Sequence, residues 1–523
     1  MNLAILIVSF DGPTFEAECQ IKRSPLHHSQ PNYWDFSALR LSTATLHRLP
    51  EQVARPTYDR EAIKPGIVHL GIGAFHRAHQ AVVCDDLLAM GDMRWGVRGA
   101  SLRSAAVRDT LAAQDGLYTM LVRDGREERA RVIGSVVDVL VLPEDPGALI
   151  AALAHHDTHM VTLTVTEKGY RLDPASGALR LDDPDVAADA RRSAPPRTVP
   201  GVLVAALAER RARGLPAPTL ISCDNLEHNG WKLRAAVLAM ASEWDAGLRD
   251  WIADQARFPQ TMVDRIVPAT TDADIAALAE RLGMTDMAMV KTEPFTQWVV
   301  ENSFAGQHPD LASVGVTLTD DVGSWEAAKL RLLNGAHSTI AYLGGLAAIE
   351  FVHEVVALKG GRGMVEALWD EAQTTLSPPP ELDLPGYRDA LMARFTNPAL
   401  AHRTRQIAMD GSQKLPQRLV ATAAERIAAD LPIAAVALGI AGWMRWQEGR
   451  TDGGTSFSVE DPLADVTASA LSGRSTSADR VAALLGLEAV FPRRLAEEPQ
   501  FANAIAEQHR RLCEDGAAAI LQG

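Results

Sequence analysis

The pattern of predicted strands and helices changes near residue 320, and this change constrains the fold more than any other feature of the sequence. Before it, short apolar runs alternate with helical segments. Strands that alternate with helices form a parallel sheet covered on both faces. We therefore predict an N-terminal α/β Rossmann-like domain. Its strands are expected at 66–71, 95–101, 132–141, 159–165 and 218–223, and its helices at 74–90, 105–113, 148–153 and 203–213.

The second half of the chain shows no strand pattern and predicts a mostly α-helical C-terminal domain. A cleft between two such domains is a common place for a ligand. We assign residues 46–320 to the dinucleotide-binding domain and 321–523 to a helical substrate domain, and we expect residues 1–45 to be a poorly ordered extension. Helices are expected at 325–349, 363–375, 386–395, 415–429, 433–447, 477–485 and 501–521.

The composition is that of a soluble globular protein and excludes several functional classes. The 523 residues include 66 acidic and 51 basic side chains, a net charge of −15 that argues against a nucleic-acid partner. The four cysteines are far apart and favour reduced thiols over disulfides or a zinc ribbon. No apolar run approaches the length of a membrane span, so we expect a cytoplasmic protein without a membrane partner.

A glycine-rich turn follows the first predicted strand and begins a helix. Gly71 and Gly73 permit a tight turn and let a pyrophosphate approach the helix N-terminus, whereas His76 replaces the third glycine of the dinucleotide-binding pattern. The strand-turn-helix context leaves two alternatives of similar weight, a dinucleotide-binding turn and an ordinary strand-to-helix turn. Segment 100–106 holds no carboxylate for the ribose hydroxyls, so the residues do not separate NAD from NADP.

The predicted helix at 325–349 carries polar residues on one side. At about 100° per residue, Lys329 lies at about 0°, Asn334 at about 140°, His337 at about 80° and Glu326 at about 60° around the helix axis. If buried, this side forms a general-base site, because a lysine acts as a base when burial or charge lowers its pKa. If exposed, it is an ordinary polar stripe.

Other polar segments have both functional and structural interpretations. Asn225 follows a strand and could donate to an oxyanion or form a turn. For Asp264 and Arg265 the simpler interpretation is a buried ion pair. Lys414 could bind an anion or be an ordinary surface lysine. The sequence lacks Y-x-x-x-K at its tyrosines, G-x-S-x-G and any His, Cys or carboxylate set with metal-ligand spacing, so no metal site is expected.

Several ordered segments together resemble the polyol-specific long-chain dehydrogenase family, which contains mannitol 2-dehydrogenase and fructuronate reductase. The resemblance runs from about residue 50 to the C-terminus. Its segments are 71–80, 164–170, 222–225, 258–266, 293–298 and 329–337. The family implies a metal-independent dehydrogenase that uses NAD, with NADP not excluded, and interconverts a secondary alcohol and a ketone.

The resemblance also gives each matching residue a role. It implies that Lys329 is the general base, that Asn225 and Asn334 bind the oxyanion, that His337 orients the substrate and that Glu326 connects the lysine to solvent. The substrate-binding positions would be Asp264, Gln406, Lys414 and Lys168, and the cofactor-binding positions Gly71, Ile72, Gly73, Ala74, Phe75, Arg77, Ser101, Leu102 and Arg103.

The motifs divide between two branches of the family. Gln406 stands where the mannitol enzymes have an arginine, and 406–418, 438–446 and 167–169 look more like fructuronate reductase, whereas 99–104 resembles the mannitol branch. A sugar acid is slightly favoured, with D-mannonate and D-fructuronate first and D-mannitol and D-fructose, or a related polyol such as arabinitol, second. A non-catalytic NAD-binding regulator is the alternative of another class. We expect a small-molecule substrate and a monomer or homodimer.

Overall fold

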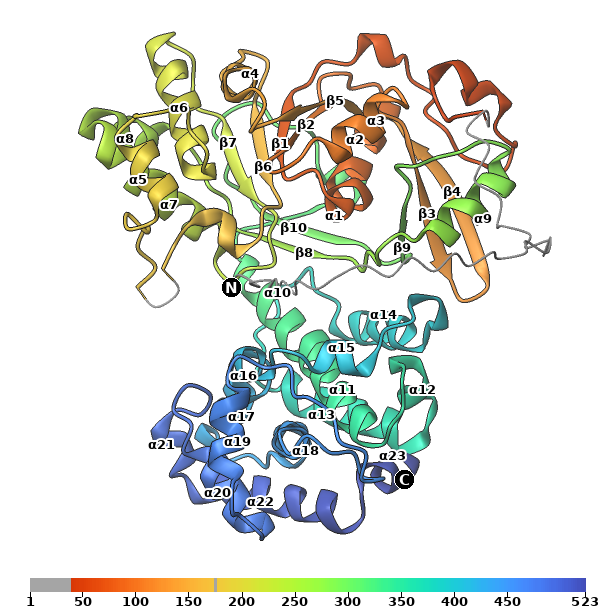
Figure 1. Cartoon of the computed structure of the whole chain (residues 1–523), viewed down its shortest axis with the longest axis vertical. Coiled ribbons are helices and arrows are strands. Elements are labelled where there is room, and N and C mark those ends of the chain that lie inside the picture. The colour runs from red at the N-terminus through yellow and green to blue at the C-terminus, as the bar shows by residue number, and fades with distance from the viewer. Residues whose placement is uncertain (1–38, 174–175) are drawn as a thin grey trace, which may run out of the picture. The chain divides into compact units, whose positions relative to one another are not determined.

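The computed structural model describes residues 39–173 and 176–523, and its first half contains a five-stranded sheet in which all the paired strands are parallel. The order is β5-β2-β1-β6-β7 (Figure 1). The chain starts in the middle strand, builds outward to β5, and then crosses to the other side of β1, so the order reverses between β1 and β6. The strands are β1 (Ile67–Leu70), β2 (Val97–Ser101), β5 (Val136–Val141), β6 (Met160–Leu163) and β7 (Thr219–Ser222).

Both faces of this sheet are buried, as alternating strand residues show. Val68 and Leu70 pack against α4, α6 and α7, whereas Ile67 packs on the other face with α2 and the strands β8 and β10. The helices of this half are α1 (Ala74–Ala78), α2 (Gln80–Ala89), α3 (Ala106–Ala112), α4 (Pro146–Leu153), α5 (Pro184–Ala190), α6 (Val199–Ala212), α7 (Asn229–Trp244), α8 (Ala246–Gln255) and α9 (Asp272–Leu282).

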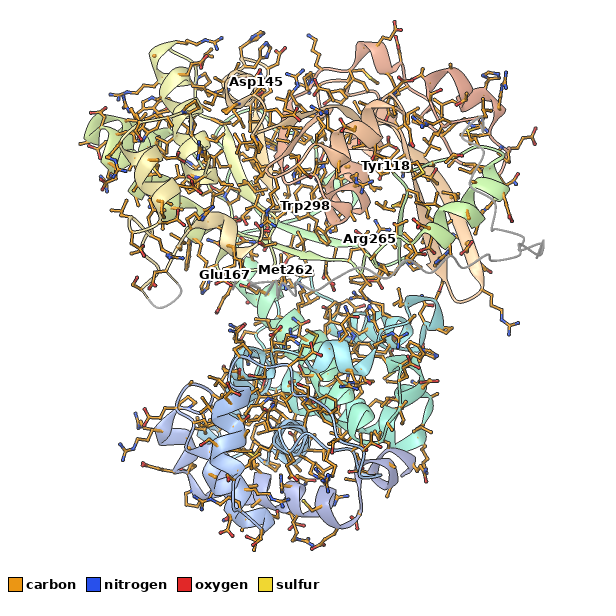
Figure 2. The ribbon with its side chains drawn as sticks, viewed as in Figure 1. Tyr118, Asp145, Glu167, Met262, Arg265 and Trp298 are labelled. Carbon is orange, nitrogen blue, oxygen red and sulfur yellow. The ribbon has the colours of Figure 1, made fainter. Side chains whose placement is uncertain are left out.

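Two small sheets complete the first half, and their strands are absent from our predictions, apart from the part of β4 inside the segment expected at 132–141. One is β11-β10-β8, and the other β4-β3-β9. Met262 and Arg265, labelled in Figure 2, lie in β8 and directly after it. The strands are β3 (Tyr118–Asp124), β4 (Glu127–Ile133), β8 (Thr261–Asp264), β9 (Val290–Thr292), β10 (Gln297–Glu301) and β11 (Thr317–Thr319).

Three predicted elements are each divided in the structure. The helix expected at 501–521 is two helices, α22 (Pro499–Glu514) and α23 (Ala517–Gln522). The strand expected at 132–141 is two strands, because the chain leaves β4 at Gly134 and enters the parallel sheet as β5. The helix expected at 74–90 breaks at His79, whose backbone is not helical (φ −129°, ψ −90°) and whose ring contacts the Gln297 carbonyl at 3.0 Å. Apolar alternation predicts burial, but it does not show which partner a segment pairs with.

The second half is helical and has its own core around α11 (Gly335–Leu346) and α18 (Ala434–Trp446). Its other α-helices are α10 (Val322–Ala328), α12 (Val352–Ala357), α13 (Lys359–Gln373), α14 (Leu384–Thr396), α15 (Thr404–Ala408), α16 (Gly411–Leu415), α17 (Ala421–Ala428), α19 (Ala464–Leu471), α20 (Ser477–Leu485), α21 (Arg493–Ala496), α22 (Pro499–Glu514) and α23 (Ala517–Gln522). A parallel-sheet domain followed by a helical region confirms the predicted fold class.

Residues of the expected extension that the structure describes pack against the first domain. Leu41 is fully buried, and its N–H donates to the Thr285 carbonyl at 3.0 Å. Residues 1–38 of the expected extension lie outside the described residues. Among the residues that the structure describes, no helix combines the length and hydropathy that crossing a bilayer requires.

Candidate active site

The glycine turn lies where the strand order reverses, between the carboxyl ends of β1 and β6. Gly71 has φ +95°, and a Cβ there would lie 2.2 Å from the Thr164 carbonyl oxygen, so the position requires glycine. At Gly73 the nearest atom to such a Cβ is 3.8 Å away, which leaves open space before α1. An open backbone at a switch point of a parallel sheet fits a dinucleotide phosphate.

Lys329 is 7% exposed, so the polar side of the helix is buried at this residue. This is the alternative that favours a general-base site over an exposed polar stripe. Its Nζ donates to Asn225 Oδ1 and to the Val263 carbonyl, both at 2.7 Å. Burial lowers its pKa, Arg394 and Arg418 lower it further, and Asp264 and Glu326 oppose them. A neutral amine has two N–H groups, which these two acceptors take, and its lone pair remains for a third partner.

The helix that carries Lys329 departs from α-geometry at this point. Residues Lys329–Asn334 form a π-helical turn between α10 and α11. An α-helical hydrogen bond joins residues four apart, whereas a π-turn joins residues five apart and brings them to the same side. Lys329 and Asn334, which a regular helix would separate by about 140°, therefore both face the same cavities.

The loop after β7 brings Asn225 to the lysine. Asp224, the preceding residue, is buried and accepts hydrogen bonds from the Thr166 N–H at 2.7 Å and the Tyr170 hydroxyl at 2.6 Å. Burial raises the pKa of Asp224 despite these two bonds. Asn225 uses its side-chain oxygen for Lys329, and its Nδ2 group is left to donate to a ligand.

Asp264 belongs to a buried ion-pair network that joins β8 to α14. Arg394 binds Asp264 through two nitrogens at 2.6 and 3.0 Å and Glu293 at 2.8 and 2.9 Å. The three side chains are 7% exposed or less, and the Arg394 guanidinium lies 4.2 Å from the ring centre of Phe295. The simpler sequence interpretation, an Asp264–Arg265 pair, is wrong, because Arg265 donates to the Ala78 and Glu293 carbonyls instead.

Two further titratable groups flank the lysine. Burial and the charge of Glu227 raise the pKa of Glu326 to about 7, with Lys329 among the groups that lower it. Burial lowers the pKa of His337 well below its usual value, and His402 and Arg394 add to this effect. His337 therefore stays neutral at neutral pH, with its ring centre 4.8 Å from that of Phe395.

Two cavities meet at Lys329. The larger, about 470 Å³, extends from the glycine turn past Asp264 and Arg394 to His337. The smaller, about 170 Å³, is lined by Glu326, Lys414 and Arg418. A dinucleotide at the glycine turn and a small polar substrate would thus meet beside the lysine. The residues common to both cavities are Asp224, Asn225, Val263, Lys329 and Asn334.

Two cations line the smaller cavity besides Lys329. Lys414 Nζ donates to the Met409 carbonyl at 2.5 Å and the Ile407 carbonyl at 3.4 Å, and burial lowers its pKa. Arg418 lies on a second π-turn, Pro416–Val420, and its Nη1 donates to Ser338 Oγ at 3.1 Å. The cavity therefore offers positive charge to an anionic substrate group.

Several of the expected site residues do not line these cavities. Gln406 and Lys168 are exposed outside both, and Ile72 is buried beneath Gly99. Arg77 also points away, because its guanidinium donates to the Ala288 carbonyl and lies 5.5 Å from the Tyr118 ring centre. Gly71, Gly73, Ala74 and Phe75 line the larger cavity, whereas Ser101, Leu102 and Arg103 lie at and just after the neighbouring strand end.

Sequence reasoning missed the partners that complete the site: Arg394, Glu293, Arg418 and the Val263 carbonyl. Glu293 and Val263 stand in segments that carry the family resemblance, and Arg418 ends the segment 406–418 that resembles one branch, but Arg394 lies in an ordinary-looking helix. The contacts of Arg394 follow from long-range packing, for which the local sequence gives no signal.

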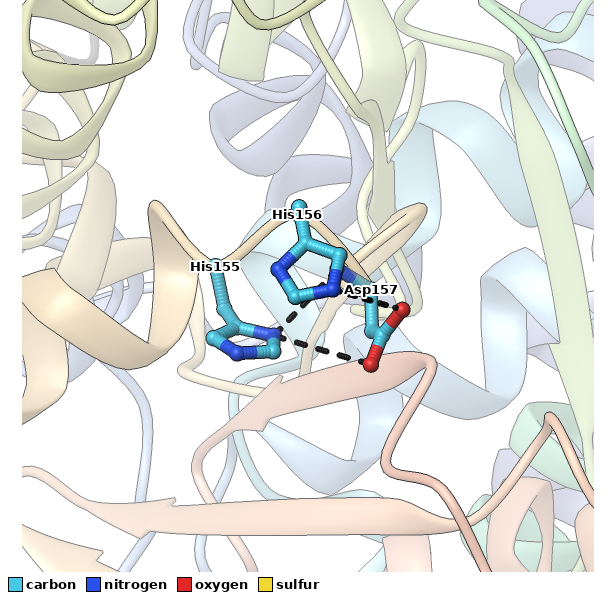
Figure 3. Close-up of side chains that lie close together, drawn as sticks. All are labelled: His155, His156 and Asp157. Carbon is cyan, nitrogen blue, oxygen red and sulfur yellow. Dashed lines mark hydrogen bonds and ion pairs between the residues drawn. The ribbon is translucent and has the colours of Figure 1, made fainter.

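Potential metal ligands gather elsewhere among the described residues. His155, His156 and Asp157 come together on an exposed turn, where His156 Nε2 lies 3.3 Å from Asp157 Oδ1 (Figure 3). Glu448, His509 and Cys513 form the other group. Neither group shares a residue with the two cavities at Lys329.

Two protein-family models match nearly the whole of the described chain. The family model for the mannitol dehydrogenase Rossmann domain matches residues 65–313, and the model for the mannitol dehydrogenase C-terminal domain matches residues 321–513. The division between the models agrees with the change of pattern near residue 320.

Individual relatives come from both branches that the motifs suggest. D-mannonate oxidoreductase of Escherichia coli is 41% identical, over 89% of this chain and 96% of its own. Mannitol 2-dehydrogenase of Phaeosphaeria nodorum is 38% identical, over 97% of this chain and 89% of its own. The structure of Pseudomonas fluorescens mannitol 2-dehydrogenase, a ternary complex with NAD and D-mannitol, covers 92% of this chain and 99% of its own, with a TM-score of 0.79 and 37% identity.

Proposed function

We propose that this chain, which belongs to the mannitol dehydrogenase family, catalyses the reversible oxidation of a secondary alcohol on a sugar acid or polyol to a ketone with NAD. The observation that carries the proposal is the buried Lys329 amine at the meeting point of the two cavities. Its two hydrogen bonds leave a lone pair for a substrate hydroxyl.

The glycine turn would hold the dinucleotide. Gly71 and Gly73 give the pyrophosphate access to the backbone, and Ala74 and Phe75 line the cavity beside them. When bound there, NAD would supply the hydride acceptor for oxidation of the alcohol, and its reduced form NADH the hydride donor for reduction of the ketone. Segment 100–106 lacks a ribose-binding carboxylate, so NADP is the comparison cofactor for the assay.

The chain's own residues would move the proton and hold the developing charge. Lys329 accepts the proton of the reacting hydroxyl, while the amide groups of Asn225 and Asn334 donate to the oxygen as it becomes negative. Neutral His337 orients the substrate from the larger cavity. Glu326, which lines the smaller cavity and has a pKa of about 7, would pass the proton from the lysine toward solvent.

Within this class we propose a sugar acid, D-mannonate and D-fructuronate first, as the substrate. Lys414 and Arg418 support the choice, because two cations beside Lys329 suit a substrate carboxylate better than a neutral polyol. D-mannitol and D-fructose remain the second candidate, because the relatives of both branches are similarly close to this chain.

A steady-state assay with NAD or NADP against a panel of aldonates and polyols tests the activity and the substrate choice together. Turnover with none of them would favour a non-catalytic nucleotide-binding role. Lys414→Met should raise KM for the aldonate far more than for mannitol, because a lost charge contact weakens the anion alone. Lys168→Met is the matched control, since Lys168 is exposed outside both cavities. Equal losses for both substrates would contradict the carboxylate role of Lys414.

A further inference from the structure

A second cluster of reactive side chains lies in the helical half, on elements that do not line the cavities at Lys329. We define the Cys513 cluster as Glu448, Ser477, His509 and Cys513. His509 and Cys513 are one turn apart on α22. The His509 side chain is fully buried, whereas Cys513 is exposed, and Cys513 Sγ lies 3.6 Å from His509 Nδ1.

The other ring nitrogen, Nε2, faces a carboxylate that two arginines hold in place. Glu448 Oε1 lies 3.5 Å from His509 Nε2, while Glu448 Oε2 accepts from Arg445 at 3.1 Å and Arg480 at 2.9 Å. Burial alone would lower the pKa of His509, but Cys513 and Glu448 outweigh it, and the pKa is raised. Burial likewise opposes the lowered pKa of Glu448, which His509 and the two arginines produce.

The two ring nitrogens have different partners. Cys513 approaches Nδ1 and Glu448 approaches Nε2. A nucleophile, a histidine and an acid that orients the histidine form the arrangement that activates a nucleophile. One ligand atom from each of Glu448, His509 and Cys513 also lies within 4.8 Å of the others, so a bound metal ion is the competing outcome that the experiment must separate.

We propose that Cys513 is a modification site at which a small electrophile, in particular a peroxide, reacts with a thiol activated by His509 and Glu448. The thiol proton passes to His509 Nδ1. The sulfur then attacks one peroxide oxygen, the O–O bond breaks, and the leaving hydroxide takes the proton from His509 to become water. Sulfur is oxidised to a sulfenic acid, and the peroxide is reduced.

Alkylation by iodoacetamide, followed site by site by peptide mass spectrometry, measures this activation in the folded Cys19→Ser protein. The substitution removes Cys19, which lies outside the described residues. Cys84 and Cys223 are internal references, because both are buried and burial raises the pKa of each thiol. Cys513 should react roughly tenfold faster than glutathione at neutral pH, since a free thiol is only a few per cent ionised there. Hydrogen peroxide followed by dimedone should label the same residue.

Two variants should move the alkylation rate in opposite directions. Glu448→Gln should slow alkylation of Cys513 severalfold and shift the pH at which the alkylation rate increases to a higher value. Ser477→Ala should preserve or raise the alkylation rate. Ser477 competes for His509 Nδ1, which its Oγ contacts at 2.8 Å. Glu507→Gln, an exposed change on the same helix, is the matched control.

The competing outcomes are equally measurable. A Cys513 rate equal to that of glutathione, or an unchanged rate in Glu448→Gln, would overturn the proposal. Stoichiometric Zn²⁺ binding that needs Cys513, His509 and Glu448 together would replace the relay with a metal site.

Discussion

Replacing Arg394 by methionine should destabilise the protein and also shift its pH–rate profile. The change removes the cation that Asp264 and Glu293 share, while both carboxylates remain buried. Breaking a buried ion pair by removing one partner costs about 3–5 kcal/mol. Arg388 lies on the same helix, but its partner Asp370 is 65% exposed. Arg388→Met should therefore cost only about 0–1 kcal/mol.

The stability deficit of Arg394→Met should depend on pH in a defined direction. Burial raises the pKa of Glu293 and the Arg394 guanidinium opposes this effect, so without the guanidinium this pKa lies further above that of the unfolded chain. Between these values the native state binds more protons than the unfolded state, so its stability falls as pH rises. The deficit against the wild type should thus be larger at about pH 8 than at about pH 4.

Catalysis gives an independent measure of the same change. Arg394 lowers the pKa of Lys329, and Asp264 raises it. Loss of Arg394 removes one of the two arginines that oppose Asp264, so Lys329 keeps its proton to higher pH and the rise of kcat should move to more alkaline values. Urea unfolding and pH–rate profiles of both variants provide the measurements. A deficit no larger than that of Arg388→Met, or an acid shift of the profile, would refute the reasoning.

Three further outcomes test other parts of the site. Lys329→Ala should lose several orders of magnitude in kcat yet bind NADH in a fluorescence titration; near-normal turnover would exclude its role as base. Glu326→Gln should lose the pH–rate inflection near the carboxyl pKa of about 7, and an inflection that persists would assign it to another group. The same substitution should be relatively more stabilising above that pH than below about pH 4, where Glu326 is protonated in both states. Gly71→Ala should weaken NADH binding, because its Cβ would lie 2.2 Å from a carbonyl oxygen at φ +95°; Gly177→Ala, which also has positive φ but no neighbour within 4 Å, is the control.

The parallel sheet could be predicted because its strands carry their own signal. Residues 67–70 are buried on both faces, and such strands appear as continuous apolar runs between turn residues. The strands of the two small sheets give no such signal, and length is not the reason. β8 contains four residues, as β1 does, and β3 contains seven, but the pairing of β8 with β10 and of β3 with β9 joins segments far apart in the chain.

The site divides in a similar way. Lys329, Asn334 and His337 share one helical segment, so their spacing alone indicates a common side. The groups that accept hydrogen bonds from the lysine come from elsewhere: Asn225 is 104 residues away and Val263 is 66 residues away. No periodicity relates these positions. The place of Asn225 after a strand suggested a role for that residue alone, and only the resemblance to a family joined it to Lys329.

The π-turn explains why a prediction from regular helix geometry succeeded only in part. At about 100° per residue, Asn334 lies well away from Lys329, near the edge of the polar side. One π-turn adds a residue to the helical turn and brings Asn334 over the lysine, while His337 in α11 keeps regular spacing beyond it. Deletion of one residue between Lys329 and Asn334 should restore α-geometry and keep much of the helix. It should also keep turnover, because residues four apart in an α-helix lie on the same side and the amide and the amine would still share a substrate oxygen. Loss of turnover in a folded deletion variant would show that the π-turn itself is required.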